Sequence, residues 1–285
     1  VLPNYKWRIN PKPHVISLAK IPEANLVTPY EIGCMTKLSS LTVERGVHPL
    51  IVEAASKIAS SLIRKSATVG GNLCLDTRCF WYNQSEDWRR SIDWCHKADC
   101  GTGADCRVIP NQNTLCVATY QGDLAPNFMA LGAEVTLVGP EGERTIALSE
   151  FYQLDGMKKN VLQQGEFMLK VTLPEDSFDY MGSYQKLRVR ESWDFPEAGV
   201  SAVWKKGEYS TLKIASTALE SIPKNHTEQV SNFISSWEKG SSLTKLCDAI
   251  RKSVKPVNNT ALPPNYRRSV VRILTKRALK NIGCE

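Results

Sequence analysis

Cysteines are concentrated in one segment of this sequence. Of the nine cysteines in the chain, five lie between residues 79 and 116, namely Cys79, Cys95, Cys100, Cys106 and Cys116. They contain no Cys-x-x-Cys pair, which counts against a zinc ribbon or ring and against a ferredoxin-type motif. Thiolates that are distant in sequence can still converge in the fold, so an iron–sulfur site, a zinc site and metal-free buried thiols all remain open. The length of the segment itself indicates function, because long structureless insertions are uncommon in compact domains.

A pair of glycines precedes the cysteine segment, within Thr68-Val69-Gly70-Gly71-Asn72. Adjacent glycines allow the backbone to expose N–H groups, which can bind a phosphate or pyrophosphate group. The side chains of Thr68 and Asn72 add hydrogen-bonding capacity. An ordinary turn is the alternative interpretation, since glycine pairs are frequent in turns.

Composition limits the setting in which the protein works. The chain has 285 residues, 42% of them hydrophobic, and a formal net charge of +7. With no apolar run long enough to cross a bilayer and no signal peptide at the start, we expect a cytoplasmic protein. In a reducing cytoplasm, clustered cysteines more often bind metal than form disulfides. The densest basic cluster lies in the last predicted helix, where a solvated face is a commoner explanation than nucleic-acid binding.

The hydrophobic pattern predicts a mixed α+β chain with two regions. The elements expected in the first region are a strand at His14–Leu18, an amphipathic helix at Pro49–Arg64, a short helix at Ala125–Leu131, a hairpin at Ala133–Leu148 and a strand at Glu166–Leu173. Those expected in the second region are strands at 183–189, 199–204 and 209–215 and helices at 228–237, 243–253 and 266–279. Strands followed by helices indicate a separate small α+β domain.

Several of these motifs resemble one family. Ala67–Cys74 resembles the second flavin-binding loop of the FAD-binding medium (beta) subunits of the xanthine oxidase family of molybdenum hydroxylases. Asp123–Pro126 is similar to the next flavin-proximal segment of that family, and Ser183–Lys186 is similar to a later strand. The resemblance implies a two-domain α+β FAD-binding fold of the PCMH/CO-dehydrogenase flavoprotein type. It divides the chain into an FAD-binding domain at 1–176, which includes an iron–sulfur insertion loop at 75–121, and a C-terminal α+β flavoprotein domain at 177–285.

The same resemblance implies which residues bind FAD. They are Thr68, Val69, Gly70, Gly71, Asn72, Asp123, Leu169 and Lys186. The backbone around the two glycines would hold the pyrophosphate, Asp123 would anchor the ribityl or ring side, and Leu169 and Lys186 would lie near the isoalloxazine. The first glycine-rich flavin loop of the family has no counterpart here. Val1-Leu2-Pro3-Asn4 resembles the segment just after that loop, so we expect an N-terminal element to be missing.

The cysteine-rich insertion resembles the beta subunits of 4-hydroxybenzoyl-CoA reductases, through Asn72–Cys79 and Tyr82–Glu86. Those subunits carry a 4Fe–4S cluster in this loop. The resemblance maps the metal ligands to Cys79, Cys95, Cys106 and Cys116. Cys106 is favoured over Cys100 because Cys106-Arg107-Val108-Ile109 resembles the context of a family ligand, whereas Cys100 falls in a short extra stretch.

The function that the resemblance implies is electron transfer in a molybdenum-containing aromatic acyl-CoA reductase. The chain would relay electrons between an external donor such as a ferredoxin, the 4Fe–4S cluster, FAD, and the 2Fe–2S and molybdenum centres of a small and a large partner subunit. Catalysis at molybdenum would then take place outside this chain, with neither nucleic acid nor membrane involved. Two alternatives remain, namely an FAD subunit of a related hydroxylase that works oxidatively and a zinc-stabilised, non-redox interaction module.

Overall fold

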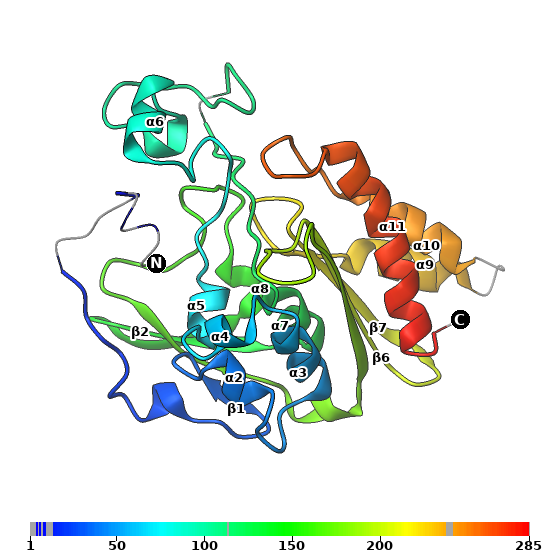
Figure 1. The fold of residues 1–285 in the computed structure, drawn as a ribbon. Helices are drawn as coiled ribbons and strands as arrows, with labels where there is room; N and C mark the ends of the chain where they lie inside the picture. The colour runs from blue at the N-terminus through cyan, green and yellow to red at the C-terminus, as the bar shows by residue number, and fades with distance from the viewer. Residues whose placement is uncertain are drawn as a thin grey trace.

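Two antiparallel sheets organise the residues that the structure describes (Figure 1). The structure is a computed structural model and describes residues 14–112, 114–237 and 242–284, together with residues 4, 6, 8 and 9. The first sheet has the strand order β1-β4-β2-β3 and the second has the order β5-β6-β7-β8. Together with the helices around them, the sheets confirm the α+β prediction. Residues Val1–Pro3 belong to the stretch that resembles the segment just after the first glycine-rich flavin loop of the family. They lie outside the described residues.

The first sheet and its helices occupy the N-terminal part of the chain. Its strands are β1 (Glu31–Gly33), β2 (Glu134–Gly139), β3 (Gly142–Ala147) and β4 (Phe167–Thr172). The helices are α2 (Leu38–Leu41), α3 (Pro49–Ser56), α4 (Ser61–Arg64), α5 (Val69–Leu73), α6 (Glu86–Ser91), α7 (Ala125–Leu131) and α8 (Leu148–Phe151), with 3-10 turns η1 (Glu23–Asn25), η2 (His96–Ala98) and η3 (Glu175–Asp179). Helix α7 and the β2–β3 hairpin agree with the sequence prediction.

Two predicted elements of this part are wrong. His14–Leu18 forms no strand, and Val15 and Ile16 are 81% and 85% exposed, because no neighbouring strand pairs with this apolar alternation. The single helix predicted at Pro49–Arg64 is two helices, since Ala59 has a φ of 44° and the Ser60 side chain caps α4 by accepting from the Ile63 N–H. A serine N-cap is a local start signal that competes with helical periodicity.

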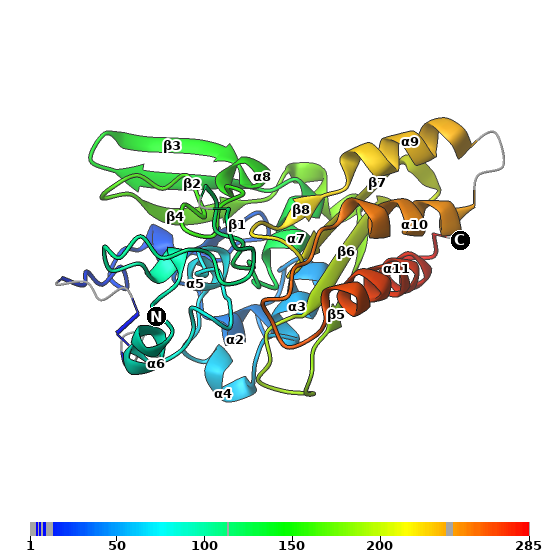
Figure 2. The ribbon, with the colours of Figure 1, turned by 90° about the horizontal axis from the view of Figure 1, so that it is seen from above.

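The second sheet lies between two layers of helices (Figure 2). Its strands are β5 (Met181–Leu187), β6 (Ala198–Lys205), β7 (Glu208–Thr217) and β8 (Lys224–Asn225), and the helices after it are α9 (Thr227–Trp237), α10 (Leu243–Ser253) and α11 (Pro264–Asn281). Helices α3 and α7 contact β5, β6 and β7 from the N-terminal part, while α9 and α11 contact the sheet from the C-terminal part. Strand β6 is therefore buried along nearly its whole length, as expected for a strand that is covered on both faces.

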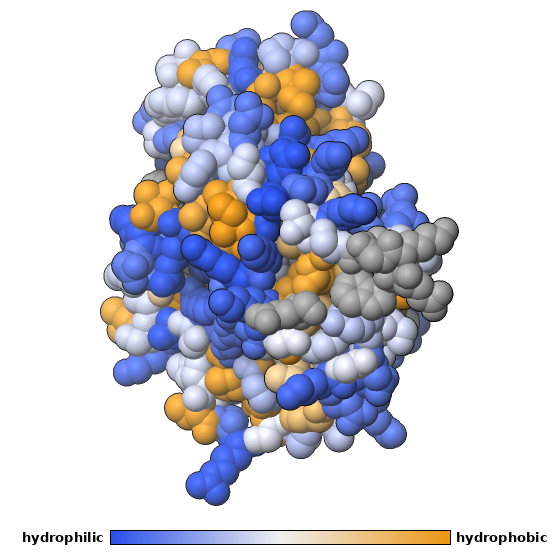
Figure 3. Space-filling view, turned by 90° about the vertical axis from the view of Figure 1, so that its right-hand side faces the viewer, coloured by the Kyte–Doolittle hydropathy of each residue, from blue (hydrophilic) through white to orange (hydrophobic). Residues whose placement is uncertain are grey.

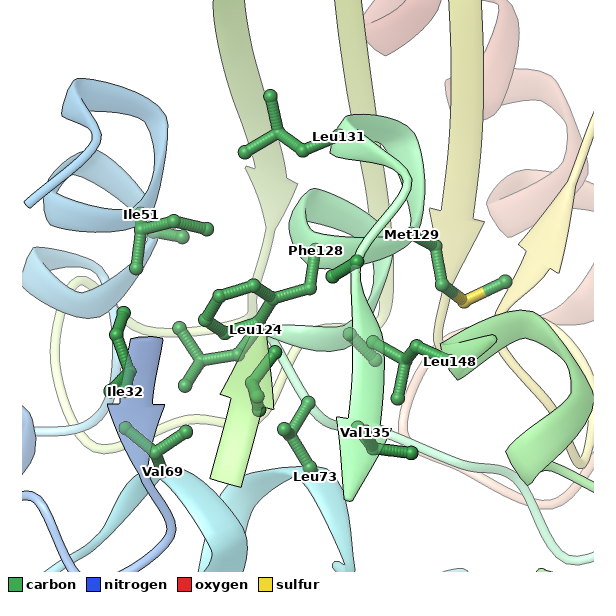
Figure 4. Packing of buried hydrophobic residues seen from close by; sticks show 14 of the residues in the cluster. Ile32, Ile51, Val69, Leu73, Leu124, Phe128, Met129, Leu131, Val135 and Leu148 are labelled. Atoms are coloured by element: carbon green, nitrogen blue, oxygen red, sulfur yellow. The ribbon is translucent and has the colours of Figure 1, made fainter. Parts of the chain in front are cut away.

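The core beneath α5 and α7 joins the flavin-like segments to the first sheet. Figure 4 shows Val69 and Leu73 of α5 pointing toward Leu124, Phe128 of α7 and Ile32 of β1. All five side chains are fully or almost fully buried. A second core lies between β6, β7 and the C-terminal helices. Burial of apolar side chains stabilises a fold by about 25 cal/mol for each Å² removed from water, so this packing holds the two flavin-like segments against each other.

The basic C-terminal helix is only partly a solvated face. Arg267 is 0% exposed and donates to the carbonyl oxygens of Glu197 at 2.9 Å, Val257 at 3.1 Å and Ala218. It therefore links α11 to the residue just before β6 and to the residue just after β7. On the side of the molecule shown in Figure 3, hydrophilic residues cover much of the surface and apolar residues form separate patches. Among the helices that the structure describes, none combines enough length with enough apolar character to cross a membrane.

Replacing Leu124 tests the core that supports the flavin-like segments. Leu124 is 0% exposed, so Leu124→Ala should lower the free energy of unfolding by about 2–5 kcal/mol through lost burial and a residual cavity. Leu62 is 69% exposed on α4 and is the matched control, for which Leu62→Ala should change the same quantity by less than about 0.5 kcal/mol. Chemical denaturation of both variants measures the difference, and equal losses would contradict this packing.

Candidate functional site

A short backbone pairing closes the cysteine-rich insertion at its base. Arg78 and Thr119 form an isolated antiparallel bridge, in which the Arg78 N–H donates to Thr119 O at 2.8 Å and the Thr119 N–H donates to Arg78 O at 2.7 Å. Figure 1 shows that the insertion, with α6, rises from the body of the protein above this base. We call the Arg78–Thr119 bridge the neck. It brings together the residues that precede and follow the insertion.

Asn72 joins the two flavin-like segments directly. Its side-chain Oδ1 accepts from the Leu124 N–H at 2.9 Å, and its backbone carbonyl accepts from the Tyr120 hydroxyl at 3.0 Å. Tyr120 is buried at 1% exposure, and its hydroxyl also reaches Leu73 O at 3.2 Å. A Cβ atom at Gly122 would lie 2.2 Å from that hydroxyl, so only glycine allows this close approach. The segments around Asn72 and Asp123 are thus adjacent in space although the insertion separates them in sequence.

The glycine pair forms the start of helix α5 rather than an open turn. The Thr68 side chain caps the helix by accepting from the Gly71 N–H at 3.1 Å, and the Asn72 N–H donates to Thr68 O at 3.0 Å. The Gly70 N–H donates to Cys34 O at 2.8 Å, and a Cβ at Gly70 would lie 2.7 Å from the Cys34 Cβ. The amides expected to bind a pyrophosphate therefore already have partners within the chain. Of the two glycines, Gly71 is the exposed one.

Asp123 and Lys186 form a buried ion pair. Lys186 Nζ lies 2.9 Å from Asp123 Oδ1, and both side chains are 3% exposed. The Tyr184 hydroxyl donates to the same carboxylate at 2.9 Å, and Lys186 also donates to Lys57 O at 2.9 Å. Burial raises the pKa of the Asp123 carboxyl and lowers that of the Lys186 ammonium, and the attraction between the two groups opposes both shifts. The sequence predicted both residues at the flavin, and the structure brings them into contact.

Val69 and Leu169 do not join this ion pair. Val69 is fully buried in the first core. Leu169 is 9% exposed on β4 and belongs to the same core. Its carbonyl accepts from the Cys34 N–H at 2.8 Å, and Cys34 O in turn accepts from the Gly70 N–H. Leu169 is therefore connected to the glycine pair through Cys34.

A cavity of about 640 Å³ lies where the two parts of the chain meet, and we call it the junction cavity. Its lining includes Cys79 and Gln121 from the two sides of the insertion and Trp193 and Phe195 from the loop after β5. The Arg78 guanidinium also lines it and lies 4.3 Å from the centroid of the Phe195 ring. The volume falls within the range of about 300–1,000 Å³ that small-molecule sites usually occupy. Arg190 lines the cavity as well, and aromatic rings together with guanidinium groups suit a planar, electron-rich ligand.

Four cysteine side chains converge on a second, much smaller cavity of about 20 Å³, the thiol cavity. They are Cys79, Cys95, Cys106 and Cys116, each between 6% and 8% exposed. Cys79 lines both the thiol cavity and the junction cavity. Cys100, in contrast, is exposed, and its thiol contacts Ala98 O. The four residues that the resemblance predicts as ligands are thus grouped, whereas Cys100 is apart from them.

Burial favours the neutral form of three of these thiols, those of Cys79, Cys95 and Cys116. It raises the pKa of the Cys79 thiol to about 12 and that of the Cys116 thiol to about 11, and it also raises the pKa of Cys95. Binding of a metal would have to displace these protons. No group of three or more His, Cys, Asp or Glu side chains has the spacing for a single metal ion anywhere in the described ranges. A single tetrahedral zinc would need sulfur atoms about 3.8 Å apart, as its bond length of about 2.3 Å requires.

The thiol cavity has polar neighbours that the sequence analysis did not identify as functional. His96 lines the cavity, and its Nε2 is buried with no hydrogen-bond partner among the residues described. Lys97 also lines it, with its side chain 7% exposed and its Nζ 2.8 Å from Asp76 Oδ1. In the sequence, the one sign of a role for His96 and Lys97 is that they directly follow Cys95. Whether their side chains face the thiol cavity depends on the fold of the loop, which the sequence does not reveal.

Comparison with known proteins connects the chain to flavin-dependent oxidoreductases. Residues 1–176 match a family model described as "FAD binding domain in molybdopterin dehydrogenase". The chain is 28% identical over 183 residues to the aldehyde oxidoreductase FAD-binding subunit PaoB of Escherichia coli (strain K12), a match that covers 60% of this chain and 56% of that protein. It is 22% identical over 290 residues to the carbon monoxide dehydrogenase medium chain of Hydrogenophaga pseudoflava, which covers 98% and 85% of the two chains.

The solved structures establish the type of fold. The carbon monoxide dehydrogenase of Hydrogenophaga pseudoflava that lacks the Mo-pyranopterin moiety superposes with a TM-score of 0.73 at 21% identity, over 99% of this chain and 86% of that one. This confirms the predicted fold of the CO-dehydrogenase flavoprotein type. The family match ends at residue 176, where the sequence analysis also divides the chain. The division into two domains, and the insertion within the first, remain predictions.

Removing one member of the buried ion pair tests its contribution. Lys186→Met leaves the Asp123 carboxylate buried without its cation, which should lower the free energy of unfolding by about 3–5 kcal/mol at neutral pH. The double variant Asp123→Asn/Lys186→Met buries no charge and should regain much of that loss. Chemical denaturation of the two single variants and the double variant gives the coupling between the side chains. A double variant as unstable as Lys186→Met would contradict a stabilising pair.

The loss in Lys186→Met should also depend on pH. Burial raises the pKa of Asp123 in the folded chain above its ordinary value of 3.8. The folded variant therefore holds this proton more tightly than the unfolded chain, and its stability falls as pH rises through the interval between the two pKa values. The destabilisation relative to the unmodified chain should be smallest below about pH 4 and largest near neutrality. Denaturation curves across this range measure it, and a pH-independent loss would exclude Asp123 as the cause.

Proposed function

Because the chain belongs to the family of FAD-binding domains of molybdopterin dehydrogenases, we propose that it is the electron-transfer subunit of a molybdenum-containing aromatic acyl-CoA reductase, similar to 4-hydroxybenzoyl-CoA reductase. The observation that carries the proposal is the grouping of Cys79, Cys95, Cys106 and Cys116 at one buried cavity beside the flavin-like segments. A generic FAD subunit has no need of four buried thiols at that position. A subunit that also carries an iron–sulfur cluster does.

For FAD, the residues of the proposal are those flanking the neck. The N–H of the exposed Gly71 and the hydroxyl of Thr68 would donate hydrogen bonds to the pyrophosphate. The Gly71 N–H can do so only after its present hydrogen bond to Thr68 Oγ1 is broken. The junction cavity is the space that would take the flavin ring, since it lies between the two parts of the chain and includes Gln121, two residues before Asp123. The Asp123–Lys186 pair would supply a fixed dipole nearby, because buried charges hold their orientation in a low-dielectric site.

For the cluster, the donor set fits. Four cysteines are the usual ligands of a 4Fe–4S cluster, and the unpartnered Nε2 of His96 offers a hydrogen bond to sulfur. Trp81 and Tyr82 line the same cavity, and Trp81 lies 5.9 Å from Trp88, so aromatic side chains would limit the access of water. A cavity of about 20 Å³ holds about one water, so a cluster has to widen it on binding.

When bound, the cluster would carry single electrons, and FAD would connect one-electron with two-electron transfer. The residues of this chain would bind and orient the two groups and shield them from water. Cys79, which lines both cavities, would be the shared wall between them. We further propose a ferredoxin-like electron donor, a small 2Fe–2S subunit and a large molybdenum subunit as partners, and a phenolic aromatic acyl-CoA as the substrate of the complex.

A second candidate is an FAD subunit of a related hydroxylase that works in the oxidative direction. The relatives named aldehyde oxidoreductase and carbon monoxide dehydrogenase favour it. The four grouped thiols favour the first candidate. The family match does not favour the zinc-stabilised, non-redox module, and the described residues include no group of side chains with the spacing of a single-metal site.

Substitution of single cysteines tests the proposed cluster. Cys106→Ser should remove most of the iron and acid-labile sulfide from protein purified without oxygen, because it deletes one of the four ligands, while bound flavin should remain. Cys100→Ser is the matched control, since Cys100 is exposed and should leave the iron content unchanged. Metal analysis and flavin absorbance measure both variants. Loss of iron in Cys100→Ser, with full retention in Cys106→Ser, would overturn the ligand assignment.

Substitution of Gly71 tests the flavin site separately. A Cβ at Gly71 would lie 3.0 Å from Thr68 Oγ1 and would cover the exposed backbone that the pyrophosphate is proposed to approach. Gly71→Ala should weaken FAD binding at least about tenfold, because the added methyl group would keep the pyrophosphate too far from the backbone N–H to form one hydrogen bond to a charged group. Folding should be retained, because alanine favours a helix over glycine by about 1 kcal/mol. Flavin titration against the control Ser61→Ala measures this, and equal affinities would contradict the proposed approach.

A further inference from the structure

One buried ammonium group accompanies the four thiols. Lys97 lies in η2, two residues after Cys95, and its side chain is 7% exposed. A lysine this deeply buried is rare unless it is paired, because taking the charge out of water is costly. The thiol cavity is lined by Lys97 and by the four cysteines. The thiol cavity thus has a buried cationic side chain in its wall beside the four thiols.

The Lys97 ammonium is fully hydrogen-bonded and fixed in position. Nζ donates to Asp76 Oδ1 at 2.8 Å, to Thr77 Oγ1 at 2.7 Å and to Thr77 O at 3.1 Å. These three bonds use all three donors of an ammonium group. Nζ also lies 4.3 Å from the centroid of the Tyr82 ring, a favourable position for a cation. The charge therefore has one location relative to the thiols.

Two nearby charges define what Lys97 contributes. Its carboxylate partner Asp76 is shared with Lys159, whose Nζ lies 3.4 Å from the same oxygen, so one anion serves two cations. Lys159 has a side chain that is 26% exposed and does not line the thiol cavity. Arg107 lines the cavity, but its side chain is 31% exposed and donates to the backbone oxygens of Asp93 and Trp94. Lys97 is thus the least solvent-screened cation of the three.

We propose that Lys97 is a positioning residue that raises the reduction potential of an iron–sulfur cluster held by Cys79, Cys95, Cys106 and Cys116. This inference rests on the proposed function. A cluster that takes up one electron from an external reductant gains one negative charge and loses no bond to its ligands. A fixed ammonium in a low-dielectric site stabilises that added charge more than solvent-exposed cations do. In the proposed step an electron alone is transferred, and the three hydrogen bonds of the Lys97 ammonium stay in place.

The test is a potentiometric titration of the cluster followed by EPR, on the full chain purified without oxygen. Lys97→Gln should shift the midpoint to a more negative value by about 59 mV, which corresponds to a tenfold change in the one-electron equilibrium. Lys159→Gln is the matched control, because it removes a lysine from the same carboxylate outside the cavity, and its shift should be clearly smaller. Iron content is measured for each variant, so that the potential is compared only between loaded proteins.

Asp76→Asn keeps the proposal falsifiable if Lys97→Gln loses its cluster. It removes the opposing negative charge, so the midpoint should shift to a more positive value. A merely structural role for the Lys97–Asp76 pair would not produce shifts of opposite sign. Unchanged midpoint potentials in cluster-containing Lys97→Gln and Asp76→Asn proteins would overturn this inference. They would not contradict the presence of the cluster. Absence of iron from the unmodified chain would instead overturn the proposed function.

Discussion

The arrangement of the candidate site depends on the neck, where Arg78 pairs with Thr119. Two backbone hydrogen bonds, of 2.8 Å and 2.7 Å, close a long insertion and return the chain to the place it left. Directly below, Asn72 receives the Leu124 N–H and the Tyr120 hydroxyl. Closing a long loop has an entropic cost that grows only slowly with its length, so a few such contacts, supported by a buried core, are sufficient. One junction thereby fixes both flavin-like segments and the base of the loop that carries the thiols.

Two ion pairs fix charges in this part of the chain: both side chains of Asp123–Lys186 are 3% exposed, whereas in Asp76–Lys97 only Lys97 is buried and Asp76 is 30% exposed. Asp123 is the first residue of the second flavin-like segment, and Lys97 lines the thiol cavity. A buried ion pair often contributes little net stability, because desolvation offsets the attraction. Its retention is better explained by a need for fixed charge at a particular point. Lys97 lines the thiol cavity and Asp123 belongs to a flavin-like segment, so each pair fixes a charge near one of the two groups that we propose this chain binds.

Much of the regular structure could be predicted from the sequence, because local signals there agree with the tertiary fold. Helix α7 and the hairpin of β2 and β3 are examples. The failures have physical causes: the apolar alternation at His14–Leu18 meets no partner strand, and the predicted helix after Pro49 breaks where Ala59 adopts a positive φ before a serine cap. Lys186, which pairs with Asp123, could be identified as a site residue only through the family resemblance, because no local sequence pattern marks it. Lys97 was missed because its importance depends on the closure of the loop around the thiols, which no local pattern encodes.

The central claim is that the neck joins a flavin site to an iron–sulfur site within one chain. The most direct measurement is the metal, acid-labile sulfide and flavin content of the unmodified full chain, purified without oxygen and examined by Mössbauer spectroscopy. We expect iron and acid-labile sulfide in equal amounts, a spectrum typical of a 4Fe–4S cluster, and bound FAD in the same molecules. Stoichiometric zinc in place of iron, or flavin-loaded protein that contains neither metal nor sulfide, would contradict it.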